Sequence, residues 1–291
     1  MMKIAILGNS YQQAALAHIN RLLQALASQG VELVIERHFG HYLKSQLPGL
    51  PAMRECQLGG ESMDAQVIVS IGGDGTFLRA AQAVAGFGTP IMGVNSGHLG
   101  YLTTADVKDT LVIVDALLHS NYRVERRSML ELDYDGEVHV SNPYALNEIA
   151  ILRQETSSMI DVTVDIGDHL LTTYKGDGLL VCTPTGSTAY NLSVGGPILD
   201  PMSQCLALSP ISPHALTMRP IVVRDDTQLT ITTRSRAPLY QVSIDGESLI
   251  LPSGTTVKIR RAPFTTGVIQ LHGTNFAHTL RSKLMWGKDN R

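Results

Sequence analysis

Apolar positions in the first part of the chain follow two alternating patterns. Short apolar runs, which we interpret as strands, occupy residues 4–7, 31–35, 67–71 and 90–94. Apolar residues between and after these runs repeat with helical periodicity, which predicts helices at 10–30, 77–84 and 108–119. Strands that alternate with helices in this way predict a parallel sheet with helices on both faces.

From about residue 125 the pattern changes to a period of two, which is typical of strands with one face in a core. Leu132 and Tyr134 lead into Asp135-Gly136, and the alternation resumes after this pair, as in a hairpin. It also flanks Gly167-Asp168 and returns at 229–231, 242–244 and 257–259. The second part of the chain is therefore predicted to be a mainly antiparallel β domain.

The change of pattern divides the 291 residues into two predicted domains, an α/β domain over 1–125 and a β-rich domain over 126–272. Neither an internal repeat nor a low-complexity tract is present, and no long linker separates the two parts. We therefore expect the ligand site in the cleft between them.

Composition narrows the class of protein. Apolar residues make up 44% and charged residues 17%, and no run of 18 apolar residues occurs, so we expect a soluble protein without a membrane span. Residues 1–7 are too short for a signal sequence and read as a strand, so we expect the protein in the cytoplasm. The net charge of −3, without a long basic run, argues against nucleic acid as a partner.

The three cysteines indicate neither disulfides nor structural zinc. Cys56, Cys182 and Cys205 are odd in number and lack the paired spacing of a zinc site. We interpret them as reduced thiols.

A glycine-rich turn carries the first candidate chemistry. Gly72-Gly73-Asp74-Gly75-Thr76 follows the apolar run at 67–71 and precedes a predicted helix, where backbone amides favour phosphate. The Asp74 carboxylate would repel phosphate unless it binds a metal ion or removes a proton, so the turn suggests phosphoryl transfer. The alternative is a structural turn whose glycines supply positive φ angles and whose aspartate caps the helix.

Two further segments place polar side chains in apolar surroundings. Asn147-Glu148 interrupts an apolar stretch, and on a strand the two side chains would face opposite sides, so each needs a partner such as a sugar diol or an adenine edge. The hydroxyl-rich segment 183–193 predicts a turn that opens onto a short helix and suits ribose, phosphate and base. Hydrogen bonds within the protein are the alternative for both segments.

Taken together, the motifs resemble those of the NAD kinase family, which transfers a phosphoryl group to the adenosine 2′-hydroxyl of NAD. The similar segments, in order, are 72–76, 95–102, 147–148, 177–178, 184–193 and 195–197. The Gly-Gly-Asp-Gly turn alone is shared with phosphofructokinases and lipid kinases, whereas the ordered set is specific. The classical dinucleotide fingerprint and the glycine-rich loop that ends in Gly-Lys-Ser/Thr are both absent.

The resemblance implies a role for individual residues. Asp74 would be the general base toward the 2′-hydroxyl, or would position it with the metal. Asn147 would hold the adenine, Glu148 a ribose diol and Asp177 the nicotinamide end. The adenosine pocket would be lined by Thr188, Ala189, Tyr190, Asn191, Leu192 and Ser193, with Tyr190 packed against the base. The implied set of substrate-binding residues is completed by Gly73, Gly75, Thr76, Arg79, Lys175 and Thr185.

The resemblance also implies partners. ATP would be the phosphoryl donor, and Mg²⁺ or another divalent cation would be held through its phosphates, with Asp74 as the candidate protein ligand. It further implies an α/β domain of the phosphofructokinase and NAD kinase type joined to a β-rich domain, a return of segment 273–291 to the first domain, and a homo-oligomer, either a dimer or a tetramer. Lys175 occupies a position that varies in the family with the choice between NAD and NADH. Glu247 stands where many relatives have glutamine.

Two other functions are compatible with the motifs. One is a kinase of sugar phosphates or lipids that uses the same glycine turn, and the other is a non-catalytic sensor that binds a dinucleotide. Formation of NADP from ATP and NAD distinguishes both from an NAD kinase.

Overall fold

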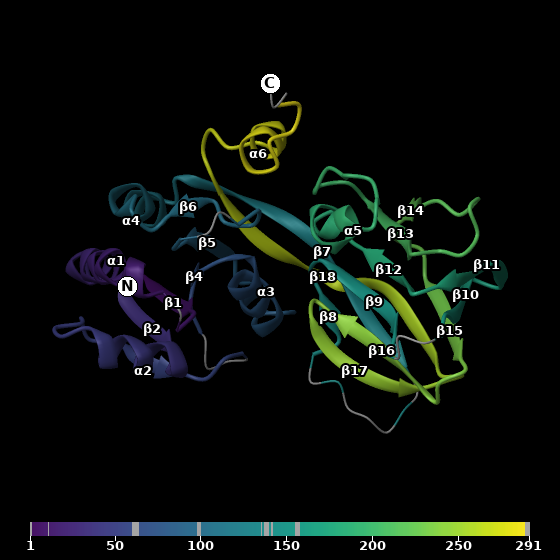
Figure 1. The fold of residues 1–291 in the computed structure, drawn as a ribbon. Coiled ribbons are helices and arrows are strands. Elements are labelled where there is room, and N and C mark those ends of the chain that lie inside the picture. The colour runs from purple at the N-terminus through teal and green to yellow at the C-terminus, as the bar shows by residue number, and fades with distance from the viewer. Residues whose placement is uncertain are drawn as a thin grey trace. The chain divides into compact units, whose positions relative to one another are not determined.

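The computed structural model describes residues 2–10, 12–59, 64–97, 100–134, 136, 140, 142–154 and 158–288. The chain divides into two compact units (Figure 1). An N-terminal unit comprises Met1–Arg126 together with Thr266–Arg291, and a β-rich unit comprises Arg127–Thr265.

Parallel strands and helices alternate in the N-terminal unit. In chain order its elements are β1 (Lys3–Gly8), the 3-10 turn η1 (Gln13–Ala15), α1 (Leu16–Ser28), β2 (Glu32–Glu36), α2 (Arg37–Gln46), β3 (Arg54–Cys56), β4 (Val67–Ile71), α3 (Asp74–Ala83), β5 (Ile91–Asn95), β6 (Ala105–Asp106), α4 (Thr110–His119) and α6 (Phe276–Lys283). The strand order is β5-β4-β1-β2-β3, and every neighbouring pair is parallel. β18 (Thr256–Leu271) pairs with β15 by its first part and, at Val268, with β5 in parallel.

Helices cover both faces of this sheet. Side chains of α1, α2 and α4 form one apolar cluster with strand residues that include Met92 and Val94. Gly93 lies between those two residues and so faces the opposite side, where the ring of Phe77 from α3 packs against it. The prediction of a parallel sheet with helices on both faces is therefore confirmed.

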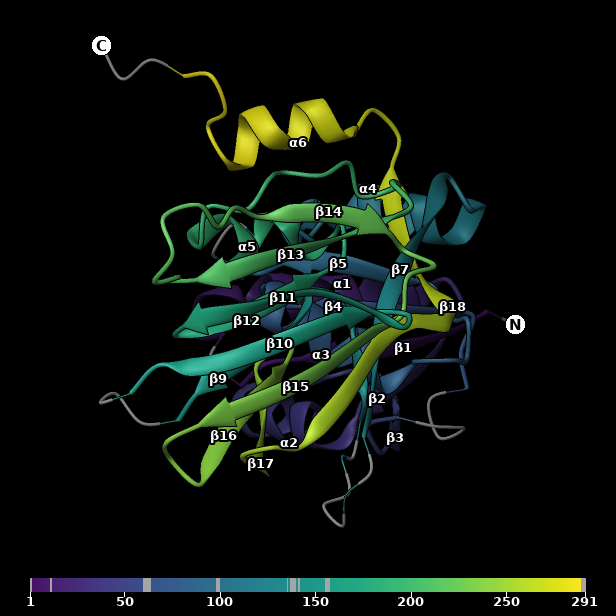
Figure 2. The same cartoon turned by 90° about the vertical axis from the view of Figure 1, so that its right-hand side faces the viewer.

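The β-rich unit is built from two antiparallel layers (Figure 2). Its strands are β7 (Tyr122–Tyr134), β8 (Tyr144–Ala145), β9 (Glu148–Arg153), β10 (Ile160–Ile166), β11 (His169–Gly176), β12 (Gly178–Cys182), β13 (Cys205–Ile211), β14 (Ile221–Arg224), β15 (Leu229–Ser235), β16 (Leu239–Ile244), β17 (Glu247–Pro252) and the first part of β18. One layer has the strand order β14-β13-β12-β9-β16-β17. The other layer contains neighbouring strands in the order β11-β10-β15-β18. Alternate residues of both layers meet in one core that includes Ile151, Val181, Val162 and Ile231, so the predicted antiparallel β domain is confirmed.

The opposite face of β9, β12 and β13 has a smaller apolar cluster of its own. Ala150, Leu180 and Ala207 lie in this cluster, and Val194 and Leu199 pack against it from the segment that follows β12. That segment contains the 3-10 turn η3 (Gly186–Thr188) and the short helix α5 (Tyr190–Ser193), so the predicted turn and short helix at 183–193 are confirmed.

One helix was missed by the sequence analysis, and one predicted turn lies mostly outside the described residues. Helix α2 was not predicted from its sequence, which contains glycine and two histidines. It forms because Glu36 accepts hydrogen bonds from the N–H groups of His38 and Phe39 at its start, and because Phe39 and Leu43 are buried. The predicted turn at Asp135-Gly136 lies mostly outside the described residues.

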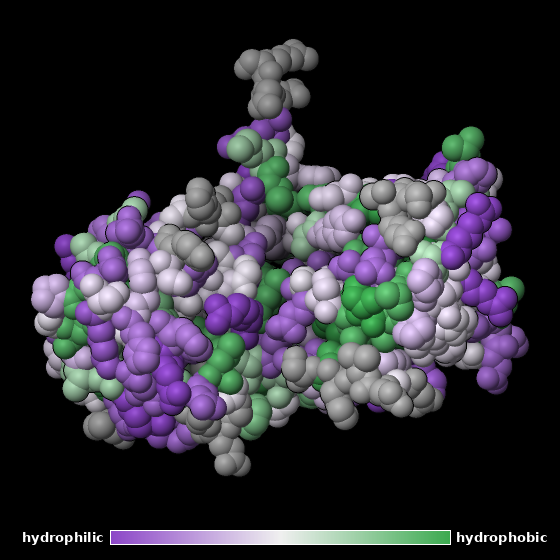
Figure 3. Space-filling view, turned by 60° about the horizontal axis from the view of Figure 1, so that its bottom comes forward, coloured by the Kyte–Doolittle hydropathy of each residue, from purple (hydrophilic) through white to green (hydrophobic). Residues whose placement is uncertain are grey.

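The surface of the N-terminal unit is mainly hydrophilic on the face that Figure 3 presents, whereas apolar side chains gather on part of the β-rich unit. Among the described residues, no helix is both long enough and apolar enough to cross a membrane.

Candidate functional site

The glycine-rich turn connects the end of β4 to the start of α3. Gly73 is the N-cap residue, and its φ of −101° is one that any residue can adopt. A Cβ atom added to Gly73 or Gly75 would meet no heavy atom within 4 Å among the described residues. Neither backbone conformation nor internal packing therefore requires glycine at these two positions.

The same turn presents backbone donors. The first N–H groups of an α-helix lack acceptors in a preceding turn, although that of Thr76 donates to the Gly73 carbonyl at 3.1 Å, and the helix dipole favours negative charge at this end. A phosphate that approached the open faces of Gly73 and Gly75 would meet these groups.

The Asp74 carboxylate does not cap its own helix, so the expected alternative of a helix cap is wrong for this residue. Instead, one oxygen accepts a hydrogen bond from the N–H of Tyr101 at 2.8 Å, and the other accepts one from the N–H of Leu102 at 2.9 Å. Gly100 lies so close that a Cβ atom there would overlap with the carboxylate. The segment 95–102 and the glycine turn are thus brought together, although His98 and Leu99 fall outside the described residues.

A second group of polar side chains surrounds a bend in the β-rich unit. Residues 146 and 147 leave the strand geometry, and β9 begins only at Glu148. The expectation that both residues belong to one strand was therefore wrong for Asn147, whereas Glu148 does begin a strand. The cause is the Asp245 carboxylate, which accepts hydrogen bonds from the N–H groups of Leu146 at 2.6 Å and of Asn147 and Glu148 at 2.9 Å each.

Asp245 owes this position to a two-residue hairpin turn. Asp245 and Gly246 connect β16 to β17, with φ angles of 47° and 93° that match the turn favoured by Asp-Gly. Sequence reasoning missed Asp245, although the Asp-Gly pair between two alternating strands was a signal for the turn.

Burial dominates the electrostatics of this bend. It raises the pKa of Glu148 to about 8, the nearby charge of Asp245 adds to the effect, and the N–H of Tyr190 opposes it. Burial likewise raises the pKa of Asp245 to about 6 against the three N–H donors. At neutral pH Asp245 therefore carries the negative charge, and Glu148 is mostly protonated and able to donate a hydrogen bond.

Two polar atoms at the bend lack protein partners. Asn147 Oδ1 and Glu148 Oε2 are buried and have no hydrogen-bond partner among the described residues. Buried polar atoms are satisfied in the great majority of cases, so these two atoms are candidates for contact with a ligand.

The hydroxyl-rich segment packs directly on this bend. Thr183 donates from Oγ1 to the Leu146 carbonyl at 2.6 Å and accepts from the Gly186 N–H at 3.1 Å. A side chain at Gly186 would overlap with the carbonyl of Asn147, so only glycine permits this approach. The structure therefore brings Asn147, Glu148 and the segment 183–193 into one cluster, as expected.

The side chains of the segment 183–193 differ in burial and in their hydrogen bonds within the protein. Asn191 is fully buried, donates to the carbonyls of Ser187 and Pro197, and accepts from Ser209 Oγ at 2.6 Å. Its amide thus holds the segment together. Thr185 is buried and accepts from Arg127 at 3.3 Å. The exposed members are Tyr190, Leu192 and Ser193, and Thr188 and Ala189 are half-buried.

The remaining predicted residues have other neighbours. Asp177 forms an ion pair with Arg153 at 2.9 Å, and the exposed Lys175 lies 3.7 Å from Asp161. Arg79 is exposed on α3, and Thr76 is buried beside Gly72. The assignment of Lys175 and Asp177 as ligand residues rests on the resemblance.

Fold and site together define a phosphotransferase-like protein with a glycine turn in an α/β unit and a β-rich second unit. Models of the ATP-NAD kinase N-terminal domain and the ATP-NAD kinase C-terminal domain match residues 4–122 and 146–271. The chain is 43% identical to an NAD kinase of Bacteroides fragilis over 290 residues, all of both chains. It is also 43% identical to an NAD kinase of Porphyromonas gingivalis over 289 residues, 99% of each chain.

Solved structures agree with these relatives. An NAD kinase from Archaeoglobus fulgidus in complex with ATP has a TM-score of 0.76 at 26% identity, covering 96% of this chain and 99% of that one. Yeast NADH kinase complexed with NADH shares the fold, with a TM-score of 0.89 at 20% identity over 100% of this chain and 89% of that one. This protein belongs to the NAD kinase family.

The raised pKa of Glu148 makes a prediction about stability. Between pH 4.5 and about 8 the folded state binds more protons than the unfolded state, so the free energy of unfolding falls as pH rises through that window. Glu148→Gln removes this contribution. Urea denaturation between pH 5 and 8 should show a decrease that is about 1–3 kcal/mol smaller in the variant than in the wild type.

Glu247→Gln is the matched control, because it also removes one carboxylate from the neighbourhood of the same hairpin but at an exposed position. Equal pH dependence in the wild type and Glu148→Gln would contradict the assignment of the raised pKa to Glu148.

Proposed function

We propose that this protein is an NAD kinase that transfers the γ-phosphoryl group of ATP to the 2′-hydroxyl of the adenosine ribose of NAD and so forms NADP. Membership of the family over the whole chain supports this function above a sugar-phosphate kinase, a lipid kinase or a dinucleotide sensor. The observation that carries the mechanism is the Asp74 carboxylate, held at the start of α3 by two backbone N–H groups beside two open glycines.

The glycine turn would bind the donor phosphates. Gly73 and Gly75 allow the phosphates to approach the backbone, and the N–H groups at the start of α3 and the helix dipole stabilise their negative charge. Thr76 supports the turn from its buried side next to Gly72. Phosphoryl transfer is catalysed mainly by positioning and electrostatic stabilisation, and this turn supplies both.

Asp74 would accept the proton of the 2′-hydroxyl or hold that hydroxyl in line with the γ-phosphorus. Each carboxylate oxygen accepts one N–H bond in the structure and retains lone-pair capacity for a further donor. Because both oxygens are already oriented by the backbone, little ordering of this group is needed when the substrate binds.

The dinucleotide would be recognised at the Asn147 bend. Asn147 Oδ1 would accept a hydrogen bond from the adenine, and the protonated Glu148 can both donate to and accept from a ribose diol. Tyr190 would pack its exposed ring against the base, with Thr188, Ala189, Leu192 and Ser193 beside it. Arg79, Lys175, Asp177 and Thr185 remain proposed ligand residues on the basis of the resemblance.

Protein side chains would supply only part of the coordination of a divalent cation at this site. Among the described residues, no group of three or more His, Cys, Asp or Glu side chains could hold a metal ion. A Mg²⁺ ion would therefore be held by the donor phosphates, with Asp74 as the protein carboxylate nearest to the glycine turn. When bound it would neutralise charge on the transferred phosphoryl group.

The proposal includes a cytoplasmic location and a homo-oligomer, which the resemblance supports. Light scattering coupled to gel filtration tests the oligomer, since a monomeric mass at micromolar concentration would contradict it.

Asp74→Asn should retain NAD binding and lose most turnover, because the amide cannot accept a proton and offers only one oxygen to the two N–H donors. We expect kcat to fall by about 10²–10⁴-fold, with a loss of about 1–2 kcal/mol in stability from the missing hydrogen bond. NADP formed from ATP, Mg²⁺ and NAD is measured with an NADP-specific coupled dehydrogenase, and NAD binding by calorimetry. Turnover near that of the wild type would overturn the proposed role.

Gly75→Ala should move stability and donor affinity in opposite directions. The added methyl group meets no described atom and replaces a flexible residue in a helix, so the free energy of unfolding should rise by about 0.4–1 kcal/mol. The same methyl group would occupy the space of the donor phosphates and raise the KM for ATP about tenfold or more, while the KM for NAD serves as the internal control. An unchanged KM for ATP would show that the open face of Gly75 does not meet the donor.

A further inference from the structure

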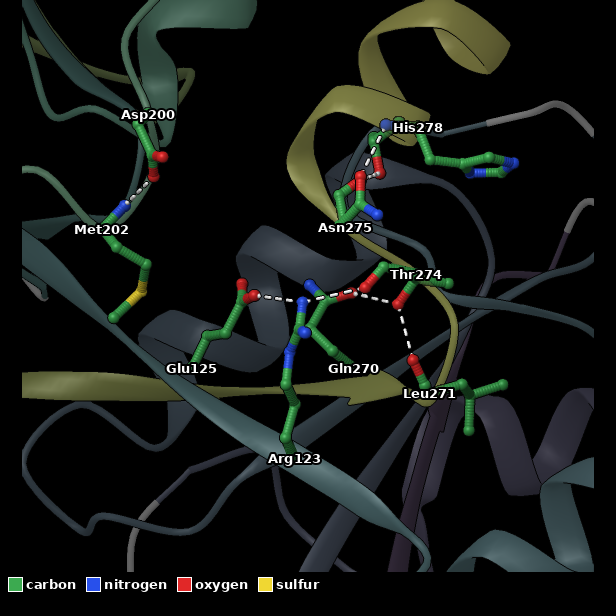
Figure 4. A network of polar contacts seen from close by, with 10 residues as sticks. Arg123, Glu125, Asp200, Met202, Gln270, Leu271, Thr274, Asn275 and His278 are labelled. Carbon is green, nitrogen blue, oxygen red and sulfur yellow. Dashed lines mark hydrogen bonds and ion pairs between the residues drawn. The ribbon is translucent and has the colours of Figure 1, made fainter.

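Helix α6 is attached to the N-terminal unit with little apolar burial. None of its residues is buried, and the side chains of Leu280 and Leu284 are only half-buried. Polar contacts hold its beginning, as Figure 4 shows. The Asn275 side chain accepts from the His278 N–H at 2.8 Å, and Arg123 donates to the Thr274 carbonyl at 2.9 Å.

The last residue of α6 makes a different kind of contact. Lys283 donates from Nζ to the carbonyl oxygens of Gly100 at 2.7 Å, Tyr101 at 3.2 Å and Thr103. An ammonium group has three donors, and all three are satisfied by these carbonyls. Burial lowers the pKa of Lys283, and the negative charge of Asp74 acts in the opposite direction.

Two consecutive peptide groups therefore lie between Lys283 and Asp74. The peptide group that joins residues 100 and 101 offers its oxygen to Lys283 and its N–H to Asp74, and the group that joins 101 and 102 does the same. In each group the negative end of the dipole faces the ammonium and the positive end faces the carboxylate. Hydrogen bonds in such a chain polarise and strengthen one another.

We propose that Lys283 is a positioning residue for Asp74, so that α6 forms part of the catalytic apparatus. The ammonium fixes the segment 100–103, and that segment fixes the direction of both carboxylate oxygens. The inference rests on the proposed function, in which Asp74 acts on the acceptor hydroxyl. It concerns kcat more than KM, because Lys283 holds the group that acts on the hydroxyl and contacts neither proposed substrate site.

Lys283→Met tests this role, because methionine keeps an unbranched apolar side chain and removes the charge and all three donors. We expect kcat to fall about tenfold or more, with the KM values for ATP and NAD within about twofold of the wild type. Arg281→Met is the matched control, since it removes one positive charge from an exposed position on the same helix. A kcat for Lys283→Met equal to that of Arg281→Met would overturn the proposal.

A double-mutant cycle separates positioning from general support of the fold. If Lys283 acts through Asp74, Lys283→Met should reduce kcat by less than about twofold in the Asp74→Asn background. Multiplicative losses in the double variant would show that Lys283 acts elsewhere and would overturn the inference. An active Asp74→Asn variant would instead refute the proposed role of Asp74, and a wild-type protein that forms no NADP from ATP and NAD would refute the proposed function, so these failures are distinguishable.

The state of the end of α6 can be followed by fluorescence, because Trp286 is the single tryptophan and its backbone N–H donates to the Leu280 carbonyl. A shift of its emission in Lys283→Met would mean that the helix end has changed as well. In that case a second variant, Lys283→Cys, is treated with 2-bromoethylamine, which restores an ammonium group at nearly the original length, and its kcat tests the proposal. Recovery of kcat supports the inference, and no recovery after complete alkylation overturns it. Wild-type protein treated in the same way is the control for the native thiols, of which Cys56 and Cys182 are buried and Cys205 is half-buried.

Discussion

Both proposed functional turns depend on one kind of interaction, a carboxylate that accepts hydrogen bonds from consecutive backbone N–H groups. Asp74 accepts two in the N-terminal unit, and Asp245 accepts three in the β-rich unit. Backbone N–H groups outside helices and sheets need acceptors, and an ionised carboxylate is the strongest that a side chain offers. Each aspartate thereby fixes a short irregular segment that neither helix nor sheet could hold.

The two carboxylates differ in what they leave for a ligand. Asp74 is itself the proposed reactive group, and its N–H bonds orient it. Asp245 shapes the bend through its hydrogen bonds to the backbone. The side-chain oxygen atoms that lack a partner among the described residues of the bend belong to Asn147 and Glu148. The negative charge of Asp245 also raises the pKa of Glu148, so the proposed recognition of a ribose diol would use a neutral acid.

Features with a short sequence range could be predicted, and features that join distant segments could not. Strands β1, β4 and β5, the glycine turn and the hairpin at Gly167-Asp168 follow from local pattern and were confirmed. The bend at Asn147 depends on Asp245, about a hundred residues away, and the segment 100–103 depends on Lys283. Their physical cause is a contact that no periodicity encodes. Helix α2 was missed because burial of Phe39 and Leu43 outweighs a weak local preference.

The N-terminal unit is formed by residues that precede the β-rich unit in the sequence and by residues that follow it. This order affects folding during synthesis. Residues 1–126 leave the ribosome first, but the strand that pairs with β5 at Val268 and the helix that carries Lys283 are made only after the β-rich unit. The β-rich unit is continuous in sequence, so all of its residues emerge before the last part of the N-terminal unit is made. A chain whose translation stops within that unit carries the segment 100–103 without its ammonium partner.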